Sequence, residues 1–230
     1  MGMLEEAGCP IQSVAASRYL VLLLVLGAQT LCLPSPAQVL DSFNPGPIGS
    51  AYSVTLQSDG RILLGGHFLQ SPNTPAGGLL RFNADGNADS DFETYANLGF
   101  EGVAVLTNKQ ILAASGIVRR FNSDGSLDSA FVSAPGTRIL VQPDGKILSH
   151  SSALIRLNND GSLDTNFSAN VPSLFAMALQ TDGKIVVGGA FTSIDGQPRN
   201  YLARLDSQGG LDTNFNPNVG FPVYAIAVPQ

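Results

Sequence analysis

NNDGSLDTNF, residues 158–167, recurs in close copies at 83–92, 122–131 and 206–215. Asp-Gly is a turn dipeptide, because glycine accepts the positive φ that many turns require. In each copy apolar residues follow the turn at fixed positions, as in the final L-D-x-x-F. Four copies in a chain of 230 residues predict a repeat protein in which each copy belongs to one structural unit.

Three apolar runs precede each complete copy, and each run predicts a strand. Asp-Gly between the first two runs predicts a tight hairpin, at SDGR (58–61), PDGK (143–146) and TDGK (181–184), with TNKQ (107–110) as a decayed copy. We expect glycine to take the left-handed position of these turns, Gly145 for example. The pairs Gly65-Gly66 and Gly188-Gly189 in the second strands would permit close approach of a neighbouring sheet.

The repeat length indicates the fold. The phenylalanines that close the copies, Phe92, Phe131, Phe167 and Phe215, are 39, 36 and 48 residues apart. A unit of that size holds about four short strands and must stack on its neighbours to bury its sheet. A β-propeller and a β-solenoid both satisfy this, and the hairpin turns and unit length favour the propeller.

We therefore predict an all-β, β-propeller-like array of four-stranded repeats in residues 38–230. The predicted units are four near-complete repeats, at about 44–92, 93–131, 132–167 and 168–215, and a partial one at 216–230. VLDSF (39–43) resembles the last strand of a preceding unit. Two interpretations stay open: a truncated piece of a longer array with an incomplete ring, which the missing final Asp-Gly turn favours, or a small ring closed by the terminal fragments.

The pattern Q-x-DGK-I-x-x-GG-x-F, followed by R-L-N-x-DGSLD-x-x-F, resembles the delta-60 repeat of bacterial secreted proteins. The copy at 178–215 matches it almost throughout, and the resemblance covers about residues 39–230. It implies an exported bacterial protein with a propeller-type fold, and it implies no particular activity.

The N-terminus predicts export. Arg18 precedes the apolar run 19–33, and Ser35 and Ala37 follow, the order of a secretory signal peptide cut after Ala37. A membrane anchor is the alternative, but Gln29 and Thr30 interrupt the run, which is shorter than the ~20 apolar residues of a span. Removing residues 1–37 would remove both cysteines, Cys9 and Cys32. We expect a secreted or cell-surface bacterial protein without disulfides and without a membrane span in the mature chain.

The aspartates of the decapeptide raise the question of calcium. The spacing NxDGxxD resembles the latter part of a calcium loop and occurs three times, as Asn83, Asp85, Asp89, as Asn122, Asp124, Asp128 and as Asn158, Asp160, Asp164. An arginine stands where the first carboxylate ligand belongs, and Gln208 replaces the central aspartate of the fourth copy. We therefore favour a structural role and predict no metal.

The alternative to metal binding is a recurring ion pair. A partly covered arginine needs a carboxylate, and arginine and aspartate recur together at a separation of eight residues. We predict the pairs Arg81-Asp89, Arg120-Asp128, Arg156-Asp164 and Arg204-Asp212.

Catalytic motifs are missing from the sequence. His67 and His150 fall two positions apart when the second strands are aligned, and there is no G-x-S-x-G or H-E-x-x-H. We therefore predict neither catalytic residues nor a cofactor. We expect instead a binding or scaffolding module at the bacterial surface, whose partner is a glycan or a protein. The alternative is a carbohydrate-active hydrolase or lyase with carboxylates on one propeller face. A net charge of −6 disfavours nucleic acid.

Insertions in two units are further candidates for recognition. QSPNTPAGG (70–78) and TSIDGQPRN (192–200) separate the second and third strands of the first and fourth units. Loops on a rigid scaffold often carry binding residues, although ordinary variation between repeats explains them equally well.

Overall fold

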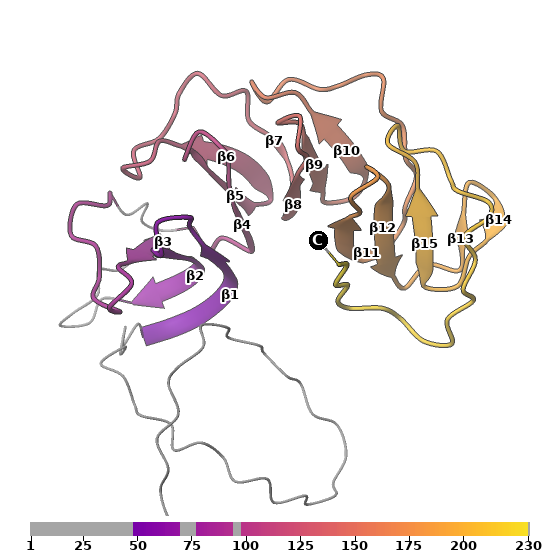
Figure 1. Cartoon of the computed structure of the whole chain (residues 1–230), viewed down its shortest axis with the longest axis horizontal. Coiled ribbons are helices and arrows are strands. Elements are labelled where there is room, and N and C mark those ends of the chain that lie inside the picture. Colours follow the sequence, from indigo (N-terminus) through magenta and orange to yellow (C-terminus); the bar gives the residue numbers. More distant parts are fainter. Residues whose placement is uncertain (1–47, 70–76, 94–97, 230) are drawn as a thin grey trace, which may run out of the picture. The chain divides into compact units, whose positions relative to one another are not determined.

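The structure, a computed structural model, describes residues 48–69, 77–93 and 98–229 (Figure 1). All of them belong to one compact unit, residues 43–230. The predicted signal peptide, 1–37, and residues 70–76 of the first insertion lie outside the described part. The described residues form strands, turns and coil, so none of them belongs to a helix that could cross a membrane.

Four antiparallel sheets follow one another along the chain, and we call each a blade (Figure 1). Blade 1 contains β1 (Ile48–Leu56), β2 (Ile62–Leu69) and β3 (Gly77–Phe82). Blade 2 contains β4 (Gly102–Val105), β5 (Ile111–Ser115), β6 (Ile117–Phe121) and β7 (Ala134–Pro135). Blade 3 contains β8 (Arg138–Val141), β9 (Ile147–His150) and β10 (Leu154–Leu157). Blade 4 contains β11 (Leu174–Leu179), β12 (Ile185–Gly189) and β15 (Leu202–Leu205), and a small hairpin of β13 (Ser193–Ile194) and β14 (Gln197–Pro198) interrupts it.

Blades 3 and 4 have three strands, so the prediction of four strands per repeat is wrong for them; the described part of blade 1 also has three. In the place of a fourth strand, each decapeptide pairs with the third strand through a single bridge, at Phe82-Ala88, Phe121-Leu127, Leu157-Leu163 and Leu205-Leu211. The Asp-Gly turn brings the chain back beside its own strand, and a second turn then leads it away. Blade 2 gains a short fourth strand, β7, which pairs with β6, and at the equivalent place in blade 3 a single bridge joins Ala169 to Leu154.

The hairpin turns have the predicted conformation. Gly60, Gly145 and Gly183 have φ of 84°, 83° and 82°. In the decayed turn Lys109 takes the same position with φ of 69°, a conformation that costs a residue with a side chain free energy. In all four turns the residue before this position accepts a hydrogen bond of 3.1 Å through its side chain, and the donor is the amide of the residue that follows this position. The acceptors are Asp59, Asn108, Asp144 and Asp182.

The core lies between blades. Leu63, Leu79 and Phe92 of blade 1 pack with Phe100, Val103, Ile111, Ala113 and Phe121 of the next unit, and all eight are buried. Of the glycine pairs, the first member faces the following unit, because a Cβ on Gly65 would lie 2.5 Å from Val103 and one on Gly188 would lie 2.6 Å from Val223. The second member faces its own partner strand.

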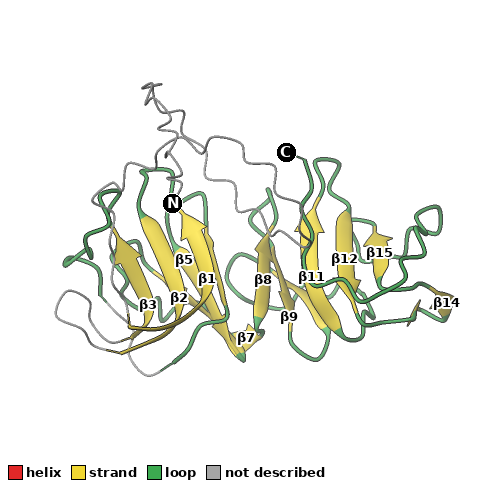
Figure 2. Cartoon of the chain, turned by 90° about the horizontal axis from the view of Figure 1, so that it is seen from below, coloured by secondary structure: helices red, strands yellow, loops and turns green. Residues whose placement is uncertain are grey.

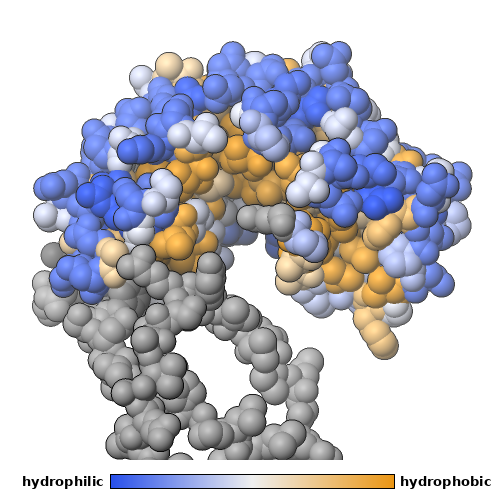
Figure 3. Space-filling view, viewed as in Figure 1, coloured by the Kyte–Doolittle hydropathy of each residue, from blue (hydrophilic) through white to orange (hydrophobic). Residues whose placement is uncertain are grey.

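The first strands of consecutive blades are neighbours: β4 contacts β1, β8 contacts β4, and β11 contacts β8. Figure 2 shows the long strands of the four blades running alongside one another. In Figure 3 hydrophobic residues gather over the first strands, and hydrophilic residues cover the turns beyond them. This stacking of small sheets through their faces is the arrangement that a blade array requires.

Candidate functional site

The decapeptide is a pair of turns fixed by its own aspartates. Asp160 accepts the amide of Ser162 at 2.9 Å and its hydroxyl at 2.6 Å, which closes the first turn. Asp164 accepts the amide of Asn166 at 3.0 Å, which closes the second. In the other copies the second turn is closed in the same way, by a backbone amide that donates to Asp89, Asp128 or Asp212.

The structure brings together each arginine and aspartate that the sequence pairs. The nitrogen to oxygen distances are 2.8 Å for Arg81-Asp89, Arg120-Asp128 and Arg156-Asp164, and 2.9 Å for Arg204-Asp212. Each guanidinium also lies over the phenylalanine that closes its own decapeptide, 4.4 to 4.9 Å from the ring centre. The local sequence R-x-N-x-D-G-x-x-D-x-x-F thus folds around its arginine.

A second donor reaches the same aspartate, and the sequence analysis missed it. It comes from the residue after the hairpin turn: Lys146 lies 2.7 Å from Asp164, and Lys184 lies 3.2 Å from Asp212. The hydrogen bond from Lys146, followed by those from the Asn166 amide and Arg156, lowers the pKa of Asp164 from 3.8 to about 2. The sequence feature that could have revealed this donor is the basic residue that recurs after Asp-Gly in DGK and DGR. The repeat pattern indicated no partner for it.

The arginines also join consecutive blades. Nη1 of Arg81, Arg120 and Arg156 donates to a backbone carbonyl in the following decapeptide, that of Ser123, Asn159 and Ser207 respectively. The residue after each of the first three closing phenylalanines donates its amide across the same junction, as Glu93 does to Asp124 at 2.7 Å and Val132 to Asp160 at 2.8 Å. We call this junction of two decapeptides a seam.

Eight of the nine residues of the calcium alternative use their side chains in such contacts, and Asn83 is bonded through its backbone. Asp85, Asp124 and Asp160 are exposed and bond the amide two residues on. Asp89, Asp128 and Asp164 hold an arginine, and Asn122 and Asn158 donate to the serine four residues on. Among the described residues, no three His, Cys, Asp or Glu side chains are grouped so that they could hold a metal ion.

Two clefts lie between successive hairpin turns, and they are the candidate binding site. The first, of about 380 Å³, separates the turns of blades 1 and 2 and is lined by Leu56, Gln57, Ser58, Asp59, Val105, Leu106, Thr107 and Lys109. The second, of about 260 Å³, separates those of blades 2 and 3 and is lined by Leu106, Thr107, Asn108, Val141, Gln142, Pro143, Asp144, Gly145 and Asn159. Both combine an apolar part with amide, hydroxyl and backbone groups.

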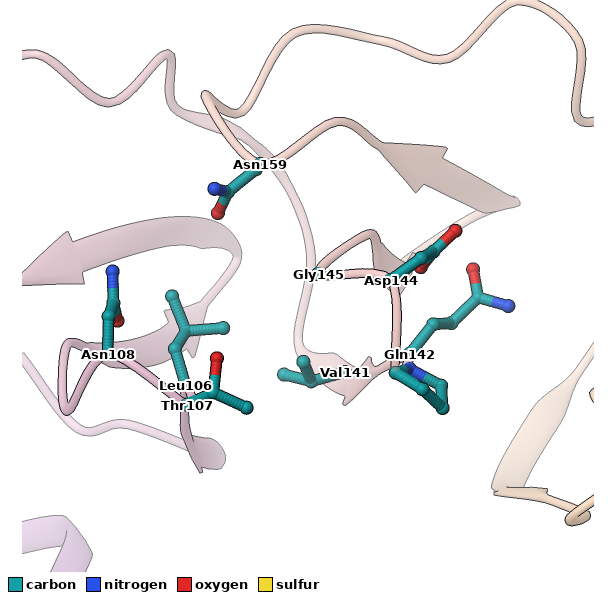
Figure 4. A pocket seen from close by; sticks show the side chains of 9 residues that line it. Leu106, Thr107, Asn108, Val141, Gln142, Asp144, Gly145 and Asn159 are labelled. Carbon is teal, nitrogen blue, oxygen red and sulfur yellow. The ribbon is translucent and has the colours of Figure 1, made fainter.

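Thr107 is common to both clefts, and Leu106 lies beside it. Figure 4 shows Leu106, Thr107 and Asn108 on one side of the second cleft and Val141, Gln142, Asp144 and Gly145 on the other, with Asn159 above them. Gln57 and Gln142 take equivalent places, at the end of the first strand, and each has a buried carbonyl oxygen with no hydrogen-bond partner among the described residues. The turns that hold these side chains are closed by their own hydrogen bonds.

The second insertion and the two histidines are the other residues that the sequence singled out, and the structure describes all of them. The insertion 192–200 folds back as β13 and β14, buries Ile194 in the core and ties Arg199 to the carbonyl of Thr213 at 3.2 Å. His67 is exposed, whereas His150 is buried and neither ring nitrogen has a hydrogen-bond partner in the described part. Burial, and secondarily the charge of Arg138, lowers the pKa of His150 below 6.5.

Similarity to solved structures concerns the fold. The chain is similar to the computationally designed Ika8 protein, with 12% identity and a TM-score of 0.53 over 77% of this chain and 52% of that one. It thus spans about half of the designed protein's length. It is also similar to virginiamycin B lyase from Staphylococcus aureus, with 14% identity, a TM-score of 0.49 and 72% and 56% coverage. The WD40 beta propeller domain of Doa1 gives 17% identity, a TM-score of 0.47 and 61% and 48% coverage.

Comparison with curated proteins gave no match. A family described as "Domain of unknown function (DUF5122) beta-propeller" matches residues 57–92, 114–131, 142–167 and 180–215, which together are just over half of the chain. Each matched segment ends at the closing phenylalanine of a decapeptide, so the family pattern follows the repeat described above. The chain belongs to this DUF5122 β-propeller family.

Proposed function

We propose that the chain is a non-catalytic binding or scaffolding module that works outside the bacterial cell, with a glycan or a protein as its ligand. The observation that carries this proposal is the repetition of one kind of cleft between successive hairpin turns. Amides, a hydroxyl and a short apolar wall are the groups that meet the polar edge and the apolar face of a sugar ring, or an extended peptide. Repeated clefts of this kind suit a repetitive ligand.

Export is part of the proposal. The order of Arg18, the apolar run and Ala37 supports a cleaved leader of residues 1–37, and the delta-60 pattern at 178–215 supports membership in that secreted repeat type. Expression in a bacterial host followed by mass spectrometry of the secreted protein tests it. The expected N-terminus is Gln38, and retention of residues 1–37 in the cytoplasm contradicts it.

Thr107→Arg tests the binding site. Thr107 is exposed and lines both clefts, so a long charged side chain fills them without disturbing the core. Thr181 holds the equivalent turn position in blade 4 and lines neither cleft, so Thr181→Arg is the matched control. On a glycan array followed by titration calorimetry, we expect at least a tenfold loss of affinity for T107R and none for T181R.

The same protein on a panel of chromogenic glycosides tests the enzymatic alternative. Turnover that T107R abolishes would make the clefts an active site and contradict the proposal of a module. Equal binding by both variants would contradict the cleft as the binding site, whatever the ligand.

A further inference from the structure

The end of the third decapeptide carries a motif that the other copies lack. Residues 166–168, Asn-Phe-Ser, have the pattern Asn-x-Ser/Thr with a residue other than proline in the middle, and this pattern occurs once in the sequence. It is the acceptor of asparagine-linked sugars when it lies on the surface of an exported protein. In the first two copies Asp91 and Ala130 stand in place of the asparagine, and the fourth has Asn214 but Asn216 in place of the hydroxyl residue.

The structure places both polar residues of the motif in solvent. Phe167, between them, is 8% exposed and packs under the guanidinium of Arg156, 4.9 Å from the ring centre. Asn166 and Ser168, on either side of it, are exposed. The buried ring therefore fixes the motif on the surface of the blade without covering the two residues that a glycosyltransferase has to reach.

The backbone of the motif is held by hydrogen bonds, whereas its side chains are free. The amide of Asn166 donates to Asp164 at 3.0 Å and closes the second turn, and the amide of Ser168 donates to the carbonyl of Gln208 across the seam at 3.1 Å. Among the residues that the structure describes, neither the side-chain amide of Asn166 nor the hydroxyl of Ser168 has a hydrogen-bond partner. Both groups are thus available, and using them breaks no bond of the fold.

Asn166 also lies apart from the candidate binding site. It belongs to the lining of neither cleft between the hairpin turns. A sugar chain attached to its exposed side chain extends into solvent, so the blade keeps its packing and the clefts stay open.

We propose that Asn166 is a site of N-linked glycosylation, an inference that rests on the export included in the proposed function. The sugar donor is a lipid-linked oligosaccharide pyrophosphate. Nδ2 of Asn166 forms a bond to C1 of the first sugar and gives up a proton to a base of the transferase. The bond from C1 to the pyrophosphate oxygen breaks, and the lipid pyrophosphate leaves with the electron pair. The transferase recognises the motif through the hydroxyl of Ser168.

The mass of the exported protein tests the proposal. The full chain is produced in a bacterial host that supplies an oligosaccharyltransferase and its lipid-linked oligosaccharide, and that is first shown to modify the residues DTNFS appended after Gln230. We expect the chain without this appendage to gain the mass of one oligosaccharide, which peptide mapping assigns to Asn166. Asn166→Gln and Ser168→Ala, both at exposed positions, should each abolish the gain.

The second decapeptide offers a matched transplant of the motif. The amide of Ala130 donates to Asp128 at 3.0 Å and that of Val132 donates to Asp160 at 2.8 Å, as those of Asn166 and Ser168 do in the third. Ala130 and Val132 are both exposed. Ala130→Asn with Val132→Ser should therefore add a second oligosaccharide, whereas Ala130→Asn alone, which lacks the hydroxyl, should add none.

The same mass spectra separate this proposal from the export on which it rests. A chain that begins at Gln38 but carries no oligosaccharide overturns the site and leaves the export intact. An oligosaccharide that survives Asn166→Gln also overturns it. If residues 1–37 stay on the chain, a leader that works in the host replaces them, and the presence or absence of the sugar on Asn166 then decides about the site alone.

Discussion

Gly161 in the third decapeptide and Gly183 in the fourth hairpin turn both follow an aspartate and have nearly the same backbone conformation, with φ of 89° and 82°. Their surroundings differ. A Cβ on Gly161 would lie 2.1 Å from the carbonyl oxygen of Val132 and 2.9 Å from the ring of Phe131, whereas a Cβ on Gly183 would meet nothing within 4 Å. The same dipeptide therefore serves a contact between blades in the seams, and only a change of chain direction in the hairpins.

Gly161→Ala and Gly183→Ala test this difference directly, and here the effect should be largest. Both variants place a side chain in the left-handed region, at a net cost of about 1 kcal/mol once the greater freedom of glycine in the unfolded chain is counted. Only Gly161→Ala adds a clash with backbone that cannot move without opening the seam, for a total of about 4 kcal/mol. Urea unfolding measures both free energies of unfolding. Equal losses in the two variants would mean that the seam yields easily and that its close contact is not required.

The arginines provide the second test, within the decapeptides alone. Arg156 bridges Asp164, Phe167 and the next decapeptide, while within the described residues Arg204 has the first two kinds of partner and a 3.5 Å contact with Gln180 of its own blade. Removing one partner of a buried ion pair is strongly destabilising because the other charge stays buried. We expect Arg156→Met to lower Tm by roughly 8 °C and Arg204→Met by about 3 °C or less. The two losses become similar if the contact with Ser207 adds nothing.

The features that the sequence could predict are those that form between residues close together in the chain. The hairpins and the Arg156-Asp164 pair form within about a dozen residues, and the pattern of the decapeptide contains both partners. Lys146 lies 18 residues from Asp164, and Arg156 lies 51 from Ser207. Those contacts require the sheet to pair and the blades to stack, and no local pattern specifies them.

The same limit explains the strand number and the clefts. Three apolar runs indicated three strands in each unit, but a decapeptide with one bridge in place of a full strand depends on Asp164 closing a second turn. The second cleft comes from two turns about 36 residues apart, at Thr107 and Pro143, and each cleft forms only because the stacking of blades brings two turns side by side. The sequence offered the insertions as candidates for recognition, with ordinary variation between repeats equally open, since it could not show which turns become neighbours.

His150 gives a smaller effect, at a position where the other blades have Gly65, Ala114 and Gly188. Its pKa is lowered by burial and by Arg138, so the unfolded chain binds more protons than the folded one below about pH 6.5. Stability should therefore fall as pH falls through that value, by at most about 1.4 kcal/mol for each pH unit.

His150→Ala, which copies blade 2, should remove this dependence between pH 7.5 and 5.5, and His67→Ala should leave it. Unfolding by urea at a series of pH values measures it. A wild-type stability that does not change over this range would show that His150 finds a partner for its proton.

Lys109 sharpens the comparison at the hairpin end, where effects should be smallest. It occupies the position of Gly60, Gly145 and Gly183 with a φ of 69°, so the strain of the left-handed region is already present in the natural chain. Its backbone amide donates to Leu106 at 2.9 Å, and glycine keeps that bond. Lys109→Gly should therefore stabilise the protein by about 0.5 to 1 kcal/mol, relief of strain being partly offset by the greater freedom of glycine in the unfolded chain.

Gly183→Lys is the reverse substitution at an equivalent turn with open space around it, and it should cost a similar amount. Opposite shifts of comparable size in Tm would establish that hairpin turns respond to backbone conformation alone, whereas a loss of stability in Lys109→Gly would mean that the lysine side chain holds the turn.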